Sequence, residues 1–229
     1  MNIMKRKILS KDGSVFVTDE IINTQTHIIG TIFAILGAAL LIVKSSTAAK
    51  PWHIVSFSIY GVTLIALFLA SSLHHGINSK KKIESIFRLF DYFAIFPLIA
   101  GTYTPLCLIL LRDWLGWTVF GVIWFLAILG IVLKAINPKL PKWVSSVFYI
   151  TMGWIGVIIA FPLIKFIKCD GLFYLILGGI FYSIGFIIFT IEKPNPVKGK
   201  FGFHEIWHIF VLLGAGSHFL LMFVKVLPF

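Results

Sequence analysis

Two histidines near the end of the chain have the spacing of a metal site. The segment HEIWH places His204 and His208 one helical turn apart, with Glu205 directly after the first of them. This is the H-E-x-x-H pattern, in which the two histidines hold zinc and the glutamate serves as base in metalloproteases. A chance match within a helix at a membrane interface is the alternative, so the pattern needs support from the rest of the chain.

A second group of reactive side chains lies in the segment SSLHHG. Ser71 and His75 are four residues apart and therefore share a helix face, whereas His74 points about 100° away. We therefore choose His75 over His74 as a candidate ligand. A catalytic zinc takes three protein ligands and a water, and His75, His204 and His208 would supply three imidazoles. Histidines that face lipid head groups are the alternative for this segment.

An aspartate in the segment RLFDYF completes a possible reaction centre. Asp91 could hold and deprotonate a water on the metal, whose pKa can fall to about 7. Ser71 could orient that water or a metal ligand by a hydrogen bond, without binding the metal itself. An ion pair between Asp91 and Arg88, one turn earlier, is the competing interpretation. We assign Asp91 and Ser71 as candidate catalytic residues.

One face of the first apolar segment carries further polar side chains. Glu20, Asn23 and His27 are spaced by three and four residues, which puts them on one side of a helix. With His74 and Glu205, they are candidates for the layer of side chains that supports the metal ligands. Glu205 is rotated about 100° from the preceding histidine, so it can face Glu20 or a cytoplasmic lysine instead of zinc.

The composition indicates that these segments lie in a membrane. Hydrophobic residues make up 59% of the 229 residues, and charged residues only 13%, about half the usual share of a soluble domain. Seven apolar stretches are long enough to cross a membrane, which takes roughly 20 residues. These stretches lie near 22–43, 53–74, 89–111, 115–133, 143–163, 172–191 and 206–227. The sequence therefore predicts an all-α bundle of seven transmembrane helices over residues 21–229, after a tail at residues 1–20.

The distribution of basic residues predicts the orientation of the bundle. Most of the 20 lysines and arginines lie in the tail and in the loops near 75–88, 134–142 and 192–200. Positive residues collect on the cytoplasmic side, so we expect a cytoplasmic tail, a C-terminus outside, and the cell membrane as location. The net charge of +11 reflects this topology or attracts anionic lipids, and nothing else in the sequence suggests nucleic-acid binding.

In this orientation the polar residues of four spans meet at one depth. The first, second, third and seventh spans all place His, Asp, Glu or Ser at their cytoplasmic ends. Charged groups within spans are costly and usually mark function. The shared depth therefore favours a metal site over separate, unrelated polar residues.

The polar motifs together resemble a known family. The matching elements are ExxNxxTHxxG, SSLHH, DYFAIFPLIAGTYTP and HEIWHIFVLLGAGSHF, in this order over nearly the whole chain. This combination resembles the hemolysin III branch of the progestin and adipoQ receptor family. The resemblance implies seven helices, an N-terminus inside, and zinc held by three histidines. The family roles fall on Ser71, His75, Asp91, His204 and His208.

Two positions depart from the family pattern. The family often has Tyr before the histidine of the second span, and this chain has His74, which could compete with His75 as ligand. The residue after the aspartate is often His, and here it is Tyr92.

The resemblance suggests three functions. The adiponectin receptors share the site and are similar to alkaline ceramidases, which implies a zinc-dependent hydrolase of a lipid acyl or amide bond, or a role in membrane lipid homeostasis. A receptor-like sensor with structural zinc is the second hypothesis, favoured if Glu205 or Glu20 is a fourth ligand. A pore-forming hemolysin is the third, and it predicts a polar stripe through the whole membrane. Membrane lipids are the expected partners, and the sequence does not set the oligomeric state.

Overall fold

The computed structural model describes residues 10–11 and 13–229, and this part of the chain is helical. It forms no named strand, which confirms the all-α prediction for these residues. The elements are α1 (Ile21–Thr47), α2 (Pro51–Gly76), α3 (Lys81–Pro105), η1 (Leu106–Leu110), α4 (Trp114–Ile136), α5 (Lys142–Trp154), α6 (Gly156–Ile191), α7 (Phe203–Leu221) and η2 (Met222–Val226). The two η elements are short π-helical turns that continue α3 and α7.

Six helical stretches in the described residues are long and apolar enough to cross a membrane. Five of them match single predicted spans, while Trp143–Ile191 contains the two predicted spans 143–163 and 172–191. A straight helix of its 49 residues would extend about 73 Å, more than twice a hydrocarbon core of about 30 Å. The backbone leaves the helical conformation within it at Lys168, where φ is 57° and ψ is −175°. The stretch is therefore not one straight helix.

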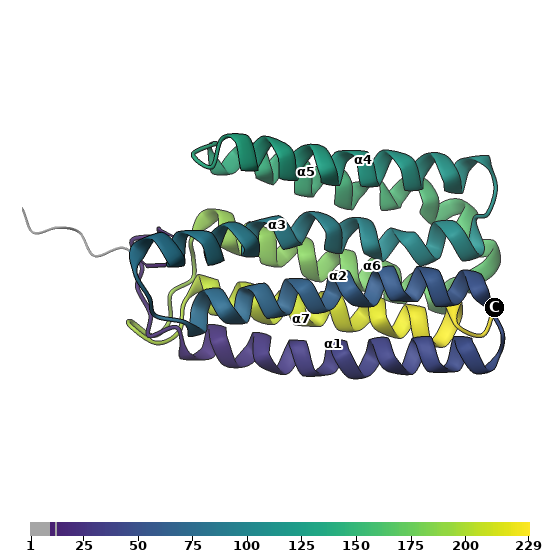
Figure 1. Cartoon of the computed structure of the whole chain (residues 1–229), viewed down its shortest axis with the longest axis horizontal. Helices are drawn as coiled ribbons and strands as arrows, with labels where there is room; N and C mark the ends of the chain where they lie inside the picture. The colour runs from purple at the N-terminus through teal and green to yellow at the C-terminus, as the bar shows by residue number, and fades with distance from the viewer. Residues whose placement is uncertain (1–9, 12) are drawn as a thin grey trace, which may run out of the picture.

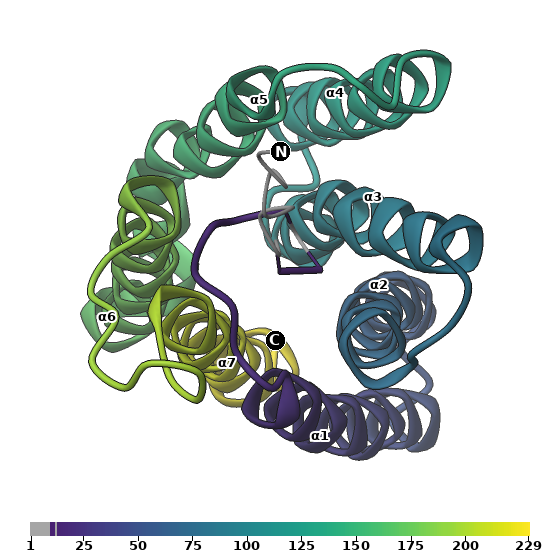
Figure 2. The same ribbon diagram turned by 90° about the vertical axis from the view of Figure 1, so that its left-hand side faces the viewer.

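The helices form a closed ring of neighbours. Consecutive helices pack against each other, and α7 packs against α1 to close the ring, as the view along the bundle shows (Figure 2). The start of α1 and the C-terminus lie at opposite ends of the bundle (Figure 1). Large apolar side chains such as Phe33, Phe125 and Phe161 are exposed on the outside. An outer surface of this kind suits contact with lipid tails.

Small residues let α2 approach both of its neighbours closely. A side chain at Gly61 would clash with Ala38 of α1, and one at Gly101 of α3 would clash with Thr63. Small residues at such contacts are typical of helix packing in membranes. Pro105 ends α3, and the π-helical turn η1 follows directly, as expected where proline interrupts the hydrogen bonding of a helix. This packing fixes the position of α2, which carries His75.

The segment before α1 crosses one end of the bundle. It runs over the mouth of the helix ring (Figure 2), and the Lys11 ammonium donates hydrogen bonds to the carbonyl oxygens of His74, His75 and Ile77 at 3.2, 2.7 and 3.0 Å. A cation is favourable at these last carbonyls of α2. The segment lies in the predicted tail at residues 1–20, of which residues 1–9 and 12 are outside the described part. Its cytoplasmic location stays a prediction.

Candidate metal centre

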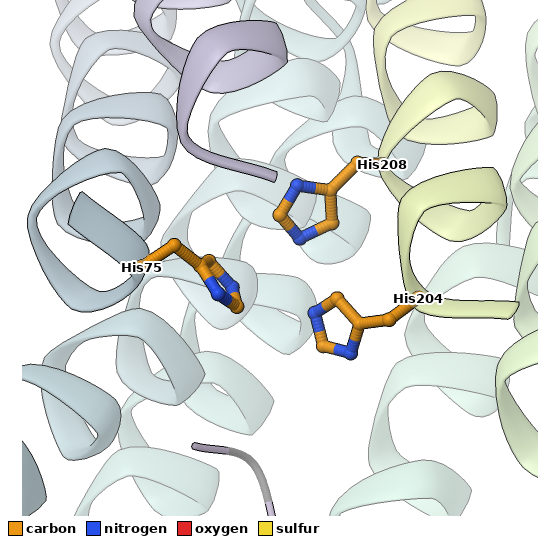
Figure 3. A group of neighbouring side chains, drawn as sticks. All are labelled: His75, His204 and His208. Atoms are coloured by element: carbon orange, nitrogen blue, oxygen red, sulfur yellow. The ribbon is translucent and has the colours of Figure 1, made fainter. Parts of the chain in front are cut away.

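Three histidines from two helices converge at the end of the bundle that the N-terminal segment crosses. His75 comes from the last turn of α2, and His204 and His208 come from the first turns of α7. One possible ligand atom from each ring lies within 4.8 Å of the others, and the rings surround a common space (Figure 3). His75 and His208 are buried, and His204 is half-buried. The structure therefore brings together the three histidines that the sequence grouped as ligands.

A capping interaction determines where α7 begins. The carboxylate of Glu205 accepts a hydrogen bond from the backbone N–H of Gly202 at 2.7 Å. This contact is the return half of a capping box at the start of the helix. Because the helix starts at Phe203, residues 204 and 208 fall in its first turns and on one face.

Two of the three histidines form hydrogen bonds with groups at the start of α1. Nδ1 of His75 donates to Oε2 of Glu20 at 2.8 Å, and Nδ1 of His208 donates to the carbonyl oxygen of Asn23 at 3.3 Å. With Nδ1 engaged, Nε2 is the nitrogen that would coordinate a metal in both rings. Metal-binding histidines usually donate their other nitrogen to a carboxylate or carbonyl in this manner.

The carboxylate of Glu205 is engaged away from the three histidines. Its Oε1 accepts hydrogen bonds from the Thr18 hydroxyl at 2.6 Å and from the Asn23 amide at 2.8 Å. The same amide donates to Glu20 at 2.7 Å. The sequence left open whether Glu205 faces zinc, Glu20 or a lysine. In the structure the Asn23 amide lies between the two carboxylates, so Glu205 joins the N-terminal segment, α1 and α7.

His27 supports His208 through ring stacking. Their ring centroids are 3.7 Å apart, with planes 13° from parallel. His27 is buried, its ring also meets the ring of Phe68 edge-on at 5.2 Å, and neither of its nitrogens has a hydrogen-bond partner within the described chain. The three predicted polar residues on one face of α1, Glu20, Asn23 and His27, therefore all contact the histidine cluster or its partners.

Asp91 also lies close to His75. It forms a second group with His74 and His75, in which one possible ligand atom from each residue lies within 4.8 Å of the others. The sequence placed Asp91 in the first turn of the third span, but α3 already begins at Lys81. The reason is that the charged segment before residue 89 is also helical, and hydropathy does not detect it. Asp91 is half-buried and well inside the helix.

The remaining candidates occupy positions close to this centre. Ser71 is buried one turn before His75 on α2, and no hydrogen bond in the described chain joins its hydroxyl to the histidines. Arg88, the alternative partner of Asp91, donates to the carbonyl oxygen of Lys11 at 3.1 Å. It therefore ties the N-terminal segment to α3.

Sequence reasoning missed two residues of the N-terminal segment. Lys11 was interpreted only as part of the basic tail, and Thr18 was not considered. Their contacts depend on how the segment crosses the bundle end, for which the sequence carries no local signal. The start of α7 was detectable, because Gly202 and Glu205 have capping spacing.

A polar hollow lies beside the cluster at this end of the bundle. It has a volume of about 340 Å³ and is lined by Asp19, Glu20, Ile21, Thr24, Gln25, His75, Gly76 and Asn78. His75 is the member that it shares with the histidine cluster. The hollow therefore adjoins the histidine cluster at His75.

The donor set fits a transition metal ion. Three imidazoles are a known catalytic zinc ligand set, and they leave a fourth position for water or substrate. Imidazole also suits copper, iron and nickel, so these donors could hold a metal ion and do not select one metal. The hydrogen bonds to Glu20 and Asn23 would fix two of the rings in orientation.

The chain matches known proteins over most of its length. A family model described as Haemolysin-III related matches residues 16–219. The chain is 41% identical over 213 residues to Hemolysin-3 of Bacillus cereus, covering 93% of this chain and 94% of the relative. It is 40% identical to the Hemolysin-3 homolog of Bacillus subtilis (strain 168), covering 89% and 92%.

More distant relatives extend beyond bacteria. The chain is 30% identical over 209 residues to the human monocyte to macrophage differentiation factor, covering 86% of this chain and 80% of the relative. The matched region of the family model includes the N-terminal Glu20 and both histidines of α7. From these matches and the motifs described above, the chain is a multi-pass membrane protein that belongs to the haemolysin III family.

Proposed function

We propose that this protein is a zinc-dependent hydrolase that cleaves an acyl or amide bond of a membrane lipid. One observation carries the proposal: three histidines converge at one end of the bundle with Asp91 close by. A carboxylate already orients one of these histidines, since Glu20 accepts from His75. Such support is common for functional metal ligands.

The residues have distinct roles in this proposal. A zinc ion on His75, His204 and His208 would supply Lewis-acid activation of water and of the substrate carbonyl. Asp91 accepts the proton of the attacking water and returns it to the leaving group. Ser71, one turn before His75, helps to orient the water.

The engagement of two carboxylates supports a catalytic rather than a structural metal. Glu20 and Glu205 were the candidates for a fourth protein ligand. Glu20 accepts from His75 and Asn23, and Glu205 accepts from Thr18, Asn23 and Gly202. With these carboxylates occupied, a position remains for water or substrate, which disfavours a closed structural site in a receptor-like sensor.

The location of the centre suits a lipid substrate. It lies at one end of a bundle whose outside is apolar, beside a polar hollow. A lipid could therefore keep its chains in the bilayer while its polar linkage reaches the histidines. A soluble peptide would gain nothing from this placement.

We further propose seven crossings with the N-terminus in the cytoplasm and the cell membrane as location. The break at Lys168 would divide Trp143–Ile191 into two passes, and the ends of the described chain lie at opposite ends of the bundle (Figure 1). Reporters fused after Phe229 test the orientation. A reporter that works only outside the cytoplasm is expected to be active, and activity of a strictly cytoplasmic reporter would overturn it.

The experiment that tests the hydrolase combines metal content with lipid turnover. Protein purified without added metal is expected to contain zinc by elemental analysis. In lipid vesicles it is expected to release fatty acid from an N-acyl lipid such as a ceramide, and chelation is expected to stop the release. Zinc at full occupancy without turnover of amide or ester lipids would favour the sensor instead.

A lytic function is the second candidate, because two relatives are named Hemolysin-3 or its homolog. The buried side of α2 also carries polar residues along its length, including His53, Ser56, Tyr60 and Ser71, as a pore would require. Dye release from vesicles tests this candidate. Release by the wild type that persists after removal of zinc would favour a pore over a hydrolase.

A further inference from the structure

The segment before α1 contacts both of the helices that carry the converging histidines. Its Lys11 ammonium donates to the carbonyl oxygen of His75 at 2.7 Å, in the last turn of α2. Its Thr18 hydroxyl donates to Oε1 of Glu205 at 2.6 Å, in the first turn of α7. The segment also crosses the mouth of the helix ring (Figure 2). We call residues 10–11 and 13–20 the strap, because they bridge the two sides of the histidine cluster.

The strap supplies a link that direct helix packing does not. In the described chain α1 packs against α2 and against α7, whereas α2 and α7 do not pack extensively against each other. The strap reaches α7 at two further points: the backbone N–H of Asp19 donates to the carbonyl oxygen of Gly199 at 3.1 Å, and a side chain at Gly202 would clash with the Phe16 ring. The ends of the two ligand-bearing helices are therefore joined through the strap and the start of α1.

A tight turn sets the position of Lys11 at the start of the strap. The backbone N–H of Gly13 donates to the carbonyl oxygen of Ser10, and the N–H of Ser10 donates to the carbonyl oxygen of Ser14, both at 3.0 Å. Gly13 has a φ of 85°, a conformation that favours glycine. Arg88 of α3 donates to the carbonyl oxygen of Lys11 at 3.1 Å. The start of the strap is therefore an ordered contact with α2 and α3.

The strap is also built to detach from the bundle. Val15 and Val17 are 59% and 36% exposed, so neither side chain packs into the bundle, and segments with few buried apolar contacts open more readily than a core. The strap meets α1 at Glu20, where φ is 62°, a left-handed conformation that costs energy in a residue other than glycine. Because the Glu20 carboxylate accepts from His75, a change of conformation at this junction would also affect that histidine.

We propose that the strap is a lid on the histidine centre. When docked, it restricts access to the centre from this end of the bundle. When released at Lys11 and Thr18, it widens the hollow beside His75, which Asp19 and Glu20 line. Metal and substrate exchange in the released state, as lids control exchange in many enzymes. The proposal rests on the proposed function only for the identity of what passes, since the lid can be observed in metal-stripped protein.

Hydrogen–deuterium exchange of metal-stripped protein in micelles tests the docking of the strap. Lys11→Met removes the ammonium at similar length, and Thr18→Val removes the hydroxyl at similar shape. Each is expected to speed amide exchange at residues 13–20 by about tenfold, the effect of losing a hydrogen bond that involves a charged group. Lys80→Met and Thr190→Val are matched controls at the same end of the bundle, and no change is expected in either.

Chemical modification of the histidines tests whether the strap controls access. Diethyl pyrocarbonate modifies accessible imidazoles, and mass spectrometry measures the rate at each position of the metal-stripped protein. Lys11→Met and Thr18→Val are expected to speed modification of the buried His75 and His208 by a factor similar to that for exchange. His53, buried at the far end of α2, is the internal control and is expected to keep its rate. Zinc-loaded protein is expected to lose its metal to a chelator faster in the same two variants.

The outcomes separate this proposal from the proposed hydrolase. Lys11→Arg and Thr18→Ser keep the donors and are expected to match the wild type in each measurement. Wild-type amides at residues 13–20 that exchange as fast as an unstructured chain overturn the docked strap. Faster exchange in Lys11→Met and Thr18→Val without faster modification of His75 and His208 overturns the control of access. Both of these results leave the hydrolase intact, whereas a protein that shows the expected modification pattern but binds no zinc overturns the hydrolase and supports the lid.

Discussion

The two ends of α2 carry buried histidines with different surroundings. At one end, His75 meets two other histidines and the carboxylate of Glu20. At the other end, His53 is also buried, but its Nε2 bonds to the carbonyl oxygen of Val226 at 3.1 Å and its ring meets that of Phe57 edge-on. Burial is therefore common to both ends of α2, and within the described chain the possible metal donors converge at the His75 end.

The charges near these two histidines also differ. The hollow beside His75 is lined by Asp19 and Glu20. The hollow beside His53, about 290 Å³, is lined by Lys50 and Arg112 among other residues, and the Arg112 guanidinium lies 4.8 Å from the ring centre of Trp52. Acidic groups favour a nearby cation and basic groups oppose it, so the carboxylates that line the hollow favour a cation at the His75 end over the His53 end, although the Lys11 ammonium also lies at the His75 end.

Substitution of a converging histidine is expected to have the largest effect. His208→Ala removes one of three imidazoles, so the tightly bound zinc should be lost and lipid hydrolysis with it. His218→Ala is the matched control, because His218 lies on the same helix and bonds to the carbonyl of Leu175. Elemental analysis and the vesicle assay measure both variants. Retention of tight zinc in His208→Ala would show that the convergence is not a metal site.

Substitution of Asp91 is expected to separate zinc binding from turnover. Asp91→Asn keeps the size of the side chain but cannot accept a proton, so turnover should fall by at least about 100-fold, the scale of general-base catalysis. The tightly bound zinc should remain. Full activity of this variant would exclude the base role. Loss of tight zinc as complete as in His208→Ala would make Asp91 a direct ligand and favour a structural site.

Substitution of Glu20 is expected to have an intermediate effect on metal affinity. Glu20→Gln weakens the acceptor for His75 Nδ1, and loss of such support usually costs about 10–100-fold in affinity. Competition with a fluorescent zinc chelator measures the change. The matched control is Glu84→Gln in the first turn of α3, for which no change is expected. Equal zinc affinities of Glu20→Gln and Glu84→Gln would show that Glu20 does not support the zinc ligands.

Substitution at the other end of α2 is expected to have the smallest effect. His53→Ala loses the hydrogen bond to Val226, worth about 1 kcal/mol, and zinc content should be unchanged. The unfolding midpoint in detergent and elemental analysis check the two parts of this prediction. A loss of zinc in this variant would break the distinction between the two ends.

The sequence could predict those parts of the site that follow from the regular spacing and burial of helical residues. Hydropathy sets how deep a residue lies in a span, and helical spacing sets its face; these two rules brought His75, His204 and His208 together. They also grouped Glu20 with Asn23 on one side of α1, where the structure joins them by a hydrogen bond.

The sequence could not predict the features that depend on irregular segments and on where helices begin or break. Lys11 reaches the end of α2 through a segment with no periodic pattern. The predicted place of Asp91 in the first turn of its helix was wrong because α3 begins at Lys81, in a charged segment that hydropathy does not detect. The apolar runs near 143–163 and 172–191 belong to one helical stretch with a break at Lys168, and the count of seven crossings stays a prediction.

The bond between Thr18 and Glu205 has a consequence for biosynthesis. These partners are separated by 187 positions in the chain, so a ribosome makes Thr18 long before Glu205. Until α7 has been inserted, the N-terminal segment lacks this anchor and His75 lacks the two histidines of α7. The centre can therefore be completed only in the last stage of translation, and a truncated chain that stops before α7 cannot assemble it.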